Sequence, residues 1–212
     1  MKYVNIDKLH LKFKNLVSAP APLGRMLNYL LYANKVGLIY KAAYRSTDLK
    51  GNIGYSWTID LMIGLGILAL RDVYANGTYK LVVTNKGNLL YRFIENKPLG
   101  YFSESTDLGT ILAIKGLLGK DAKAFTNAFE AIFKASPLYV NLCIYLQNHP
   151  KTIEKKEFYR DYFMELSNTY NRKGTIDNAG FNRLTSLVQI CVFLGYATIE
   201  NNIIHFDLRK FM

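Results

Sequence analysis

Apolar residues between positions 23 and 66 recur at intervals of three and four, the spacing of an amphipathic helix. The pattern predicts three successive helices, over residues 24–34, 38–44 and 55–65. Gly66 follows the third helix, where a left-handed glycine commonly ends one. The spacing then becomes strand-like over residues 67–74 and 79–84, on either side of Asn76-Gly77. Because Asn-Gly suits a tight turn, we expect a hairpin here, and then a helix over residues 88–95.

The same order of elements recurs in the second half of the chain. Ser136-Pro137 is a typical helix start, with serine as the N-cap and proline in the first position. Thr152 is expected to cap a helix over residues 153–166, and a longer helix is predicted from Asn178 to Leu194. A second hairpin follows around Asn201-Asn202. Residues 60–67 align with residues 189–196, because Leu-Gly closes the helix in both and a strand begins at once.

Helices followed by a hairpin are the order of a winged helix-turn-helix. We therefore expect a mostly α protein with small β-hairpins, an α+β fold of tandem winged helix-turn-helix domains. The expected divisions are a basic N-terminal arm (1–22), a first winged-helix domain (23–96), a helical connector (97–135) and a second winged-helix domain (136–212). The connector is predicted to hold two packing helices, over residues 107–118 and 121–133.

Composition adds a strong and uneven positive charge. The chain carries 27 lysines and arginines against 16 acidic residues, a formal net charge of +11. Residues 1–50 contain nine of the basic residues and only two of the acidic ones. A polyanion such as double-stranded DNA is therefore the first partner to consider.

Several protein classes do not fit the sequence. The longest apolar run, residues 59–70, is shorter than the roughly 20 residues of a membrane span, and the N-terminus does not resemble a secretory signal. Cys143 and Cys191 are too few for a disulfide framework and fit buried intracellular thiols. We expect a cytoplasmic protein with no membrane partner.

Candidate DNA contacts fall in the basic arm and around the two expected recognition helices. In the arm, basic residues share one side of an alternating segment and suit phosphate: Lys8, His10, Lys12 and Lys14. In the first domain the candidates surround the third helix and the hairpin: Lys50, Asn52, Tyr55, Ser56, Thr58, Asn76 and Lys80. In the second domain Arg172 and Lys173 suit phosphate. Amide, hydroxyl and guanidinium groups that can read bases occur at Asn178, Asn182, Arg183 and Ser186.

Catalytic chemistry has little support in the sequence. The triplet Glu154-Lys155-Lys156 matches part of a magnesium-dependent nuclease pattern, but it is predicted to start a helix, and the preceding acid, Asp121, also lies on a predicted helix. The three histidines, His10, His149 and His205, are far apart in sequence and lack neighbours at metal-ligand spacing. We expect no metal and no cofactor, and whether the chain is an enzyme stays open.

The order of elements is similar to that of a known family. Residues 55–70 contain Leu-Gly-Ile, the first hairpin closes on Val-Val-Thr-Asn-Lys-Gly, and residues 128–142 read AFEAIFKASPLYVNL. Together they resemble the DNA-recognition portion of FokI-type type IIS restriction endonucleases. The resemblance implies consecutive winged-helix subdomains that read a short asymmetric site. Two winged helices and a connector fill the 212 residues, so the nuclease is expected in a separate domain or subunit.

These observations favour sequence-specific binding of double-stranded DNA by a monomer, as the recognition module or specificity subunit of a restriction-modification system. One alternative is a winged-helix regulator of transcription or replication that binds a palindrome as a dimer. Two others are a winged-helix protein that binds only another protein, and a nuclease without a recognisable motif.

Overall fold

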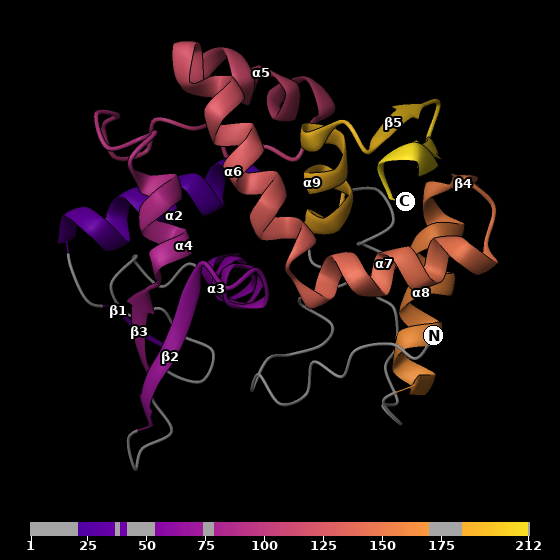
Figure 1. The fold of residues 1–212 in the computed structure, drawn as a ribbon, viewed down its shortest axis with the longest axis horizontal. Helices are drawn as coiled ribbons and strands as arrows, with labels where there is room; N and C mark the ends of the chain where they lie inside the picture. Colours follow the sequence, from indigo (N-terminus) through magenta and orange to yellow (C-terminus); the bar gives the residue numbers. More distant parts are fainter. Residues whose placement is uncertain (1–20, 37–38, 42–53, 74–78, 170–183, 212) are drawn as a thin grey trace.

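The structure is a computed structural model that describes residues 21–36, 39–41, 54–73, 79–169 and 184–211. It is mostly helical, with two small antiparallel sheets of three strands each (Figure 1). The α+β part of the expected fold class is therefore confirmed. Within the described ranges, none of the helices has the length and apolar character that a membrane crossing requires.

The N-terminal repeat, residues 23–83, ends in a helix and a hairpin. Its elements are α2 (Leu23–Val36), β1 (Ile39–Lys41), α3 (Gly54–Gly64), β2 (Leu68–Val73) and β3 (Tyr79–Val83). The strand that comes last in sequence lies in the middle of the sheet, with β1 on one side and β2 on the other. In this register, Leu81 of β3 lies opposite Ile39 of β1 and Leu70 of β2.

The C-terminal repeat, residues 137–206, has the same strand order and also ends in a helix and a hairpin. Its elements are α7 (Pro137–Asn148), β4 (Thr152–Glu154), α8 (Lys155–Thr169), α9 (Ser186–Leu194), β5 (Ala197–Glu200) and β6 (Ile203–Phe206). Here β6 is the central strand, between β4 and β5. A short 3-10 helix, Leu208–Lys210, follows.

The two repeats also match in their hydrogen bonds, in the register that the sequence predicts. In the first, Gly66 N donates to Ile63 O (2.9 Å) and Ile67 N to Met62 O (2.8 Å); in the second, Gly195 N donates to Val192 O (3.1 Å) and Tyr196 N to Cys191 O (2.7 Å). Both glycines have left-handed backbones, with φ of 73° and 74°. This paired bonding is the Schellman cap, and it turns α3 and α9 directly into the hairpins that follow them.

Local signals elsewhere also gave the predicted elements. The Ser136 hydroxyl accepts a hydrogen bond from Tyr139 N, with Pro137 as the first helical residue of α7. Asn201 and Asn202 have φ of 49° and 66°, so they form the left-handed turn between β5 and β6.

The predicted connector lies between the two repeats. It contains α5 (Leu108–Leu118), a 3-10 turn (Gly119–Asp121) and α6 (Ala122–Lys134), and it is preceded by α4 (Asn85–Tyr91). Helix α6 packs on α4 at one end and α7 at the other, and α5 packs on α9 and α2 (Figure 1). The rings of Phe125 and Phe129 on α6 lie 6.1 and 6.0 Å from that of Phe193 on α9. The buried apolar side chains of both repeats therefore form one hydrophobic core.

Four of the predicted elements differ from the structure, two in type and two in their boundaries. Residues 39–41 form strand β1 in place of a short helix, and residues 152–154 form strand β4 where the sequence predicts that Thr152 caps a helix. Both short strands exist because they pair with a distant hairpin strand, β3 or β6, which local spacing does not reveal. The last long helix begins at Ser186 instead of Asn178, with Thr185 in an extended N-cap conformation. Helix α4 spans residues 85–91 in place of residues 88–95.

Candidate nucleic-acid interface

Most of the predicted DNA contacts lie outside the described residues, so their positions stay predictions. This set comprises Lys8, His10, Lys12, Lys14, Lys50, Asn52, Asn76, Arg172, Lys173, Asn178, Asn182 and Arg183. Three others are placed by the backbone alone. Tyr55 and Ser56 lie in the first turn of α3, and Lys80 lies in β3 opposite Tyr40 of β1.

Two predicted contacts are wrong because their side chains are buried. Thr58 on α3 is fully buried, and Ser186, the first residue of α9, is 2% exposed. Neither hydroxyl can reach a DNA groove. The prediction assumes that each helix is amphipathic with a side facing solvent, whereas the structure packs other helices around both positions.

The helix before the hairpin in each repeat, α3 or α9, is covered by the rest of the protein. Every residue of α9 is buried, and α3 is buried from Thr58 to Gly64. Helices α2 and α5 pack against α9, and α2 packs against α3. The sequence of α9, SLVQICVFL, is apolar all round apart from Ser186 and Gln189, the composition of a buried helix. The body of α9 therefore cannot enter a major groove without leaving this core.

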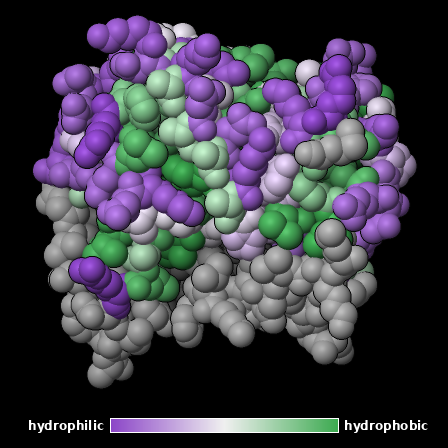
Figure 2. Space-filling model, in the orientation of Figure 1, coloured by the Kyte–Doolittle hydropathy of each residue, from purple (hydrophilic) through white to green (hydrophobic). Residues whose placement is uncertain are grey.

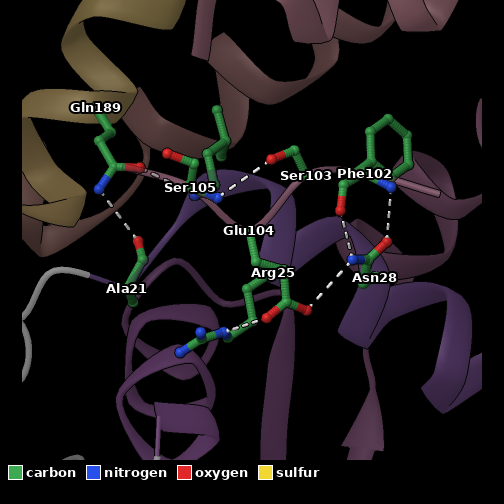
Figure 3. Close-up of polar contacts among 9 residues, drawn as sticks. Ala21, Arg25, Asn28, Phe102, Ser103, Glu104, Ser105 and Gln189 are labelled. Atoms are coloured by element: carbon green, nitrogen blue, oxygen red, sulfur yellow. Dashed lines mark hydrogen bonds and ion pairs between the residues drawn. The ribbon is translucent and has the colours of Figure 1, made fainter. Parts of the chain in front are cut away.

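The two polar residues of α9 hold the chain that leads into α2. Ser186 Oγ accepts a hydrogen bond from Ala21 N (3.0 Å) and donates one to Ala21 O (3.1 Å). Gln189 Oε1 accepts from Leu23 N (3.0 Å), which satisfies an amide that the helix itself leaves unpaired. We call these four residues, Ala21, Leu23, Ser186 and Gln189, the α2–α9 clamp. Figure 3 shows Gln189 reaching from α9 towards Ala21.

Gln189 is fully buried and uses its whole side-chain amide in this arrangement. Its Nε2 donates to Leu184 O (2.7 Å), just ahead of α9, and to Ala21 O (3.4 Å). One side chain thus joins the starts of α2 and α9, through residues Leu23 and Gln189 that lie 166 positions apart in sequence. Asp60 occupies the equivalent position of α3 and is also buried, at 1% exposed. The sequence signal for this role is a lone amide within an apolar helix.

A second polar joint fixes α2 to the connector. Asn28 Nδ2 donates to Phe102 O (2.8 Å), and Phe102 N donates back to Asn28 Oδ1 (3.0 Å). Arg25 Nε donates to Glu104 Oε2 (2.7 Å), and Figure 3 shows both contacts on one side of the helix. The backbone of the connector passes so close that a Cβ on Gly24 would lie 1.9 Å from Ser103 O. Only glycine fits at this crossing.

The two hairpins differ in the charge they expose. Arg71 on β2 is exposed, whereas the turn of the second hairpin carries the exposed residues Glu200, Asn201 and Asn202. The exposed charged side chains of the two hairpins therefore differ among the residues that the structure describes.

Other titratable groups in the described ranges join helices to one another. The Tyr196 hydroxyl donates to Glu130 Oε1 (2.6 Å), and this bond is the main reason that the pKa of Glu130 is lowered. His149 Nε2 lies 2.7 Å from Glu165 Oε1, a pairing between α8 and the end of α7 that sequence spacing missed. Among the residues that the structure describes, no three His, Cys, Asp or Glu side chains are grouped so that they could hold a metal ion.

Exposed apolar side chains are distributed among several elements. The largest are Leu89, Leu99, Tyr101, Leu112, Val140 and Met164. On the face seen in Figure 2, apolar patches are separated by hydrophilic side chains. This distribution does not identify a docking surface.

Comparisons with protein-family models, curated proteins and solved structures found no match.

Proposed function

We propose that this protein binds double-stranded DNA sequence-specifically through two winged-helix units. In this proposal it is the recognition module or specificity subunit of a restriction-modification system. The observation that carries the proposal is the repeated connectivity: each repeat ends in a helix and a hairpin, and its last strand lies between the other two. A helix that leads directly into such a hairpin is the last part of a winged helix-turn-helix, and the C-terminal repeat also has the two helices, α7 and α8, that precede it. The net charge of +11 supports a polyanionic partner.

The burial of α9 limits which residues can read bases. In the first unit we assign base contacts to Tyr55 and Ser56, in the first turn of α3, together with Asn52. In the second unit the assignment moves to the segment before α9, which carries Asn178, Asn182 and Arg183. A helix N-terminus is where recognition residues meet bases, so the buried helix bodies do not conflict with this mode.

Phosphate contacts are assigned to basic residues outside the helix bodies. The arm lysines, Lys8, Lys12 and Lys14, supply most of them, and Arg172 and Lys173 supply others. Because the two units differ in charge and in their candidate readers, the protein is proposed to bind an asymmetric site as a monomer. A nuclease domain or subunit would then cut the DNA.

Charge reversal with a matched control tests the assignment. The variant Lys12→Glu/Lys14→Glu changes the arm, and Lys120→Glu/Lys123→Glu makes the same change in net charge at two exposed connector residues. Each lost phosphate contact lowers the slope of log affinity against log salt by about 0.9. The arm variant should lower the slope by about 2, and the connector variant should leave it close to that of the wild type.

Two results would contradict this assignment. Equal loss of affinity in both variants would mean that net charge alone attracts DNA. A two-fold symmetric site bound by a dimer would favour the transcription or replication regulator instead.

A further inference from the structure

Helix α4 exposes basic and amide side chains at the base of the first hairpin. It follows β3 directly and packs against it (Figure 1). Gly87 and Leu90 are buried, and so is Ile94 just after the helix, so these residues form its inner side. Spacings of three and four residues place most of the other positions on the opposite side. Those exposed positions are Asn85, Lys86, Asn88, Leu89 and Arg92.

Two contacts hold this helix rigidly on the junction between α3 and β2. Thr84 Oγ1 donates to Gly66 O (2.6 Å) and accepts from Gly87 N (3.2 Å). A Cβ on Gly87 would lie 2.5 Å from Ile67 O, so the helix crosses the junction at a distance that requires glycine. The exposed side chains of α4 therefore start from a fixed backbone, which lowers the entropy lost when they bind a partner.

The two repeats continue in the same way after their central strands. Thr84 N donates to Ile67 O (3.0 Å) in the first, and Asp207 N donates to Tyr196 O (2.9 Å) in the second. Ile67 and Tyr196 are matching residues, since each follows its Schellman glycine. Residues 84 and 207 are therefore equivalent, and the side chain of each accepts from a backbone amide two or three residues further on.

A lysine follows in both repeats and lies over the glycine of the cap. Lys86 Nζ lies 3.7 Å from the position of a Cβ on Gly66, and Lys210 Nζ lies 3.2 Å from that of a Cβ on Gly195. Lys210 Nζ also donates to Leu194 O (3.3 Å). A positive group is favoured at this place because the carbonyl end of a helix is negative. Both repeats thus hold a lysine beside the start of their hairpin.

The charge around these two lysines differs. In the second repeat, Arg209 donates to Asp207 through Nε (2.9 Å) and Nη2 (3.0 Å), so an acid offsets part of the positive charge. In the first repeat, the sequence between residues 85 and 94 contains Lys86 and Arg92 and no acid; the next one, Glu95, comes after the helix. The first repeat therefore has the stronger site for an anion.

We infer that the exposed side of α4 contacts the phosphate backbone of duplex DNA, with Lys86 and Arg92 supplying the charge and Asn85 and Asn88 supplying neutral donors. These are side chains that commonly donate to phosphate oxygens. The inference rests on the proposed DNA binding and deepens it, because α9 and most of α3 are buried and cannot supply this contact. The contact fixes the first unit on the duplex and reads no bases.

Neutralising the two charges in the full chain tests this contact. Lys86→Gln/Arg92→Gln removes them from α4, and the matched control Lys120→Gln/Lys123→Gln removes two charges from exposed residues of the connector. Affinity for a labelled duplex is measured at about 50 mM and about 200 mM salt, where each phosphate contact contributes about 0.9 to the slope of log affinity against log salt.

The fourfold rise in salt should weaken the α4 variant much less than the wild type. Loss of two phosphate contacts makes the fall in affinity about 12-fold smaller, whereas the connector variant should match the wild type. Urea denaturation checks that both variants are folded. Should the double variant fold poorly, Arg92→Gln alone should make the fall in affinity about 3.5-fold smaller.

The outcomes separate this contact from DNA binding itself. If the α4 variant keeps the salt dependence of the wild type, the α4 contact is overturned while DNA binding stands. An equal change in the α4 and connector variants also overturns it, because net charge alone would then explain the effect. If the wild type binds no duplex, the proposed function fails, and this inference fails with it.

Discussion

Replacing Gly24 with alanine should destabilise the protein, although alanine normally favours a helix. Gly24 is the second residue of α2, and helix propensity alone predicts a gain of about 1 kcal/mol. The connector reverses this sign. An alanine Cβ would lie 1.9 Å from Ser103 O, whereas ordinary contact begins at 3.4 Å, so the backbone at Ser103 must retreat by about 1.5 Å.

The size of the loss follows from what holds the connector in place. A retreat of that size breaks the paired bonds between Asn28 and Phe102, now 2.8 and 3.0 Å long, and leaves buried polar groups unsatisfied. Their loss costs about 3–5 kcal/mol, against about 1 kcal/mol gained from propensity. The free energy of unfolding should therefore fall by about 2–4 kcal/mol in Gly24→Ala.

Urea denaturation measures this change, and Gly116→Ala is the matched control. Gly116 lies in helix α5, and no atom comes within 4 Å of the position that a Cβ would take there. Alanine at this residue should therefore raise the free energy of unfolding by about 0.5–1 kcal/mol. If Gly24→Ala proves as stable as the wild type, the close crossing of α2 and the connector is wrong.

Three further predictions concern the second repeat. Tyr196→Phe removes the hydrogen bond that is the main cause of the lowered Glu130 pKa. In the wild type, ionised Glu130 stabilises the fold above its unfolded pKa, and this stabilisation is lost as the pH falls. Denaturation measured between about pH 6 and pH 3 should therefore show a smaller loss of stability in the variant than in the wild type. Cys191 is fully buried, which raises its pKa, and mass spectrometry should find it alkylated only after unfolding. Alanine at both Asn201 and Asn202 should lower the free energy of unfolding, measured by urea denaturation, by about 1–2 kcal/mol per left-handed residue, whereas glycine at both should not.

Features with local causes could be predicted from the sequence. Gly66 and Gly195 end their helices because each adopts a left-handed backbone there, and Ser136 caps α7 through its own hydroxyl. The alignment of residues 60–67 with residues 189–196 is also confirmed, since both segments form the same Schellman cap.

Features that depend on distant partners could not be predicted in this way. Strands β1 and β4 are three residues long and exist through pairing with β3 and β6. Thr58 and Ser186 were predicted to face solvent, but both are buried, because the periodicity of a helix does not reveal what packs over it. For α9, the sequence signal that indicates burial is its almost wholly apolar composition. The contacts between Gln189 and residues 21–23 join segments that lack any common local pattern.

Burial of α9 and of most of α3 makes this pair of repeats unusual as proposed DNA readers. The proposal therefore divides the chain by role: helix bodies form the core, and the segments next to them face DNA. The α2–α9 clamp belongs to the core part of this division, since it joins the start of α2 to the second repeat.

Selection from a random duplex pool is the most direct test of the central claim. The pure 212-residue protein is incubated with the pool at moderate salt, and bound duplexes are recovered and sequenced over several rounds. The account predicts enrichment of one short asymmetric motif, with weaker recovery by Tyr55→Ala/Ser56→Ala than by Lys120→Glu/Lys123→Glu. Recovery of a pool with no enriched motif would contradict sequence-specific DNA binding.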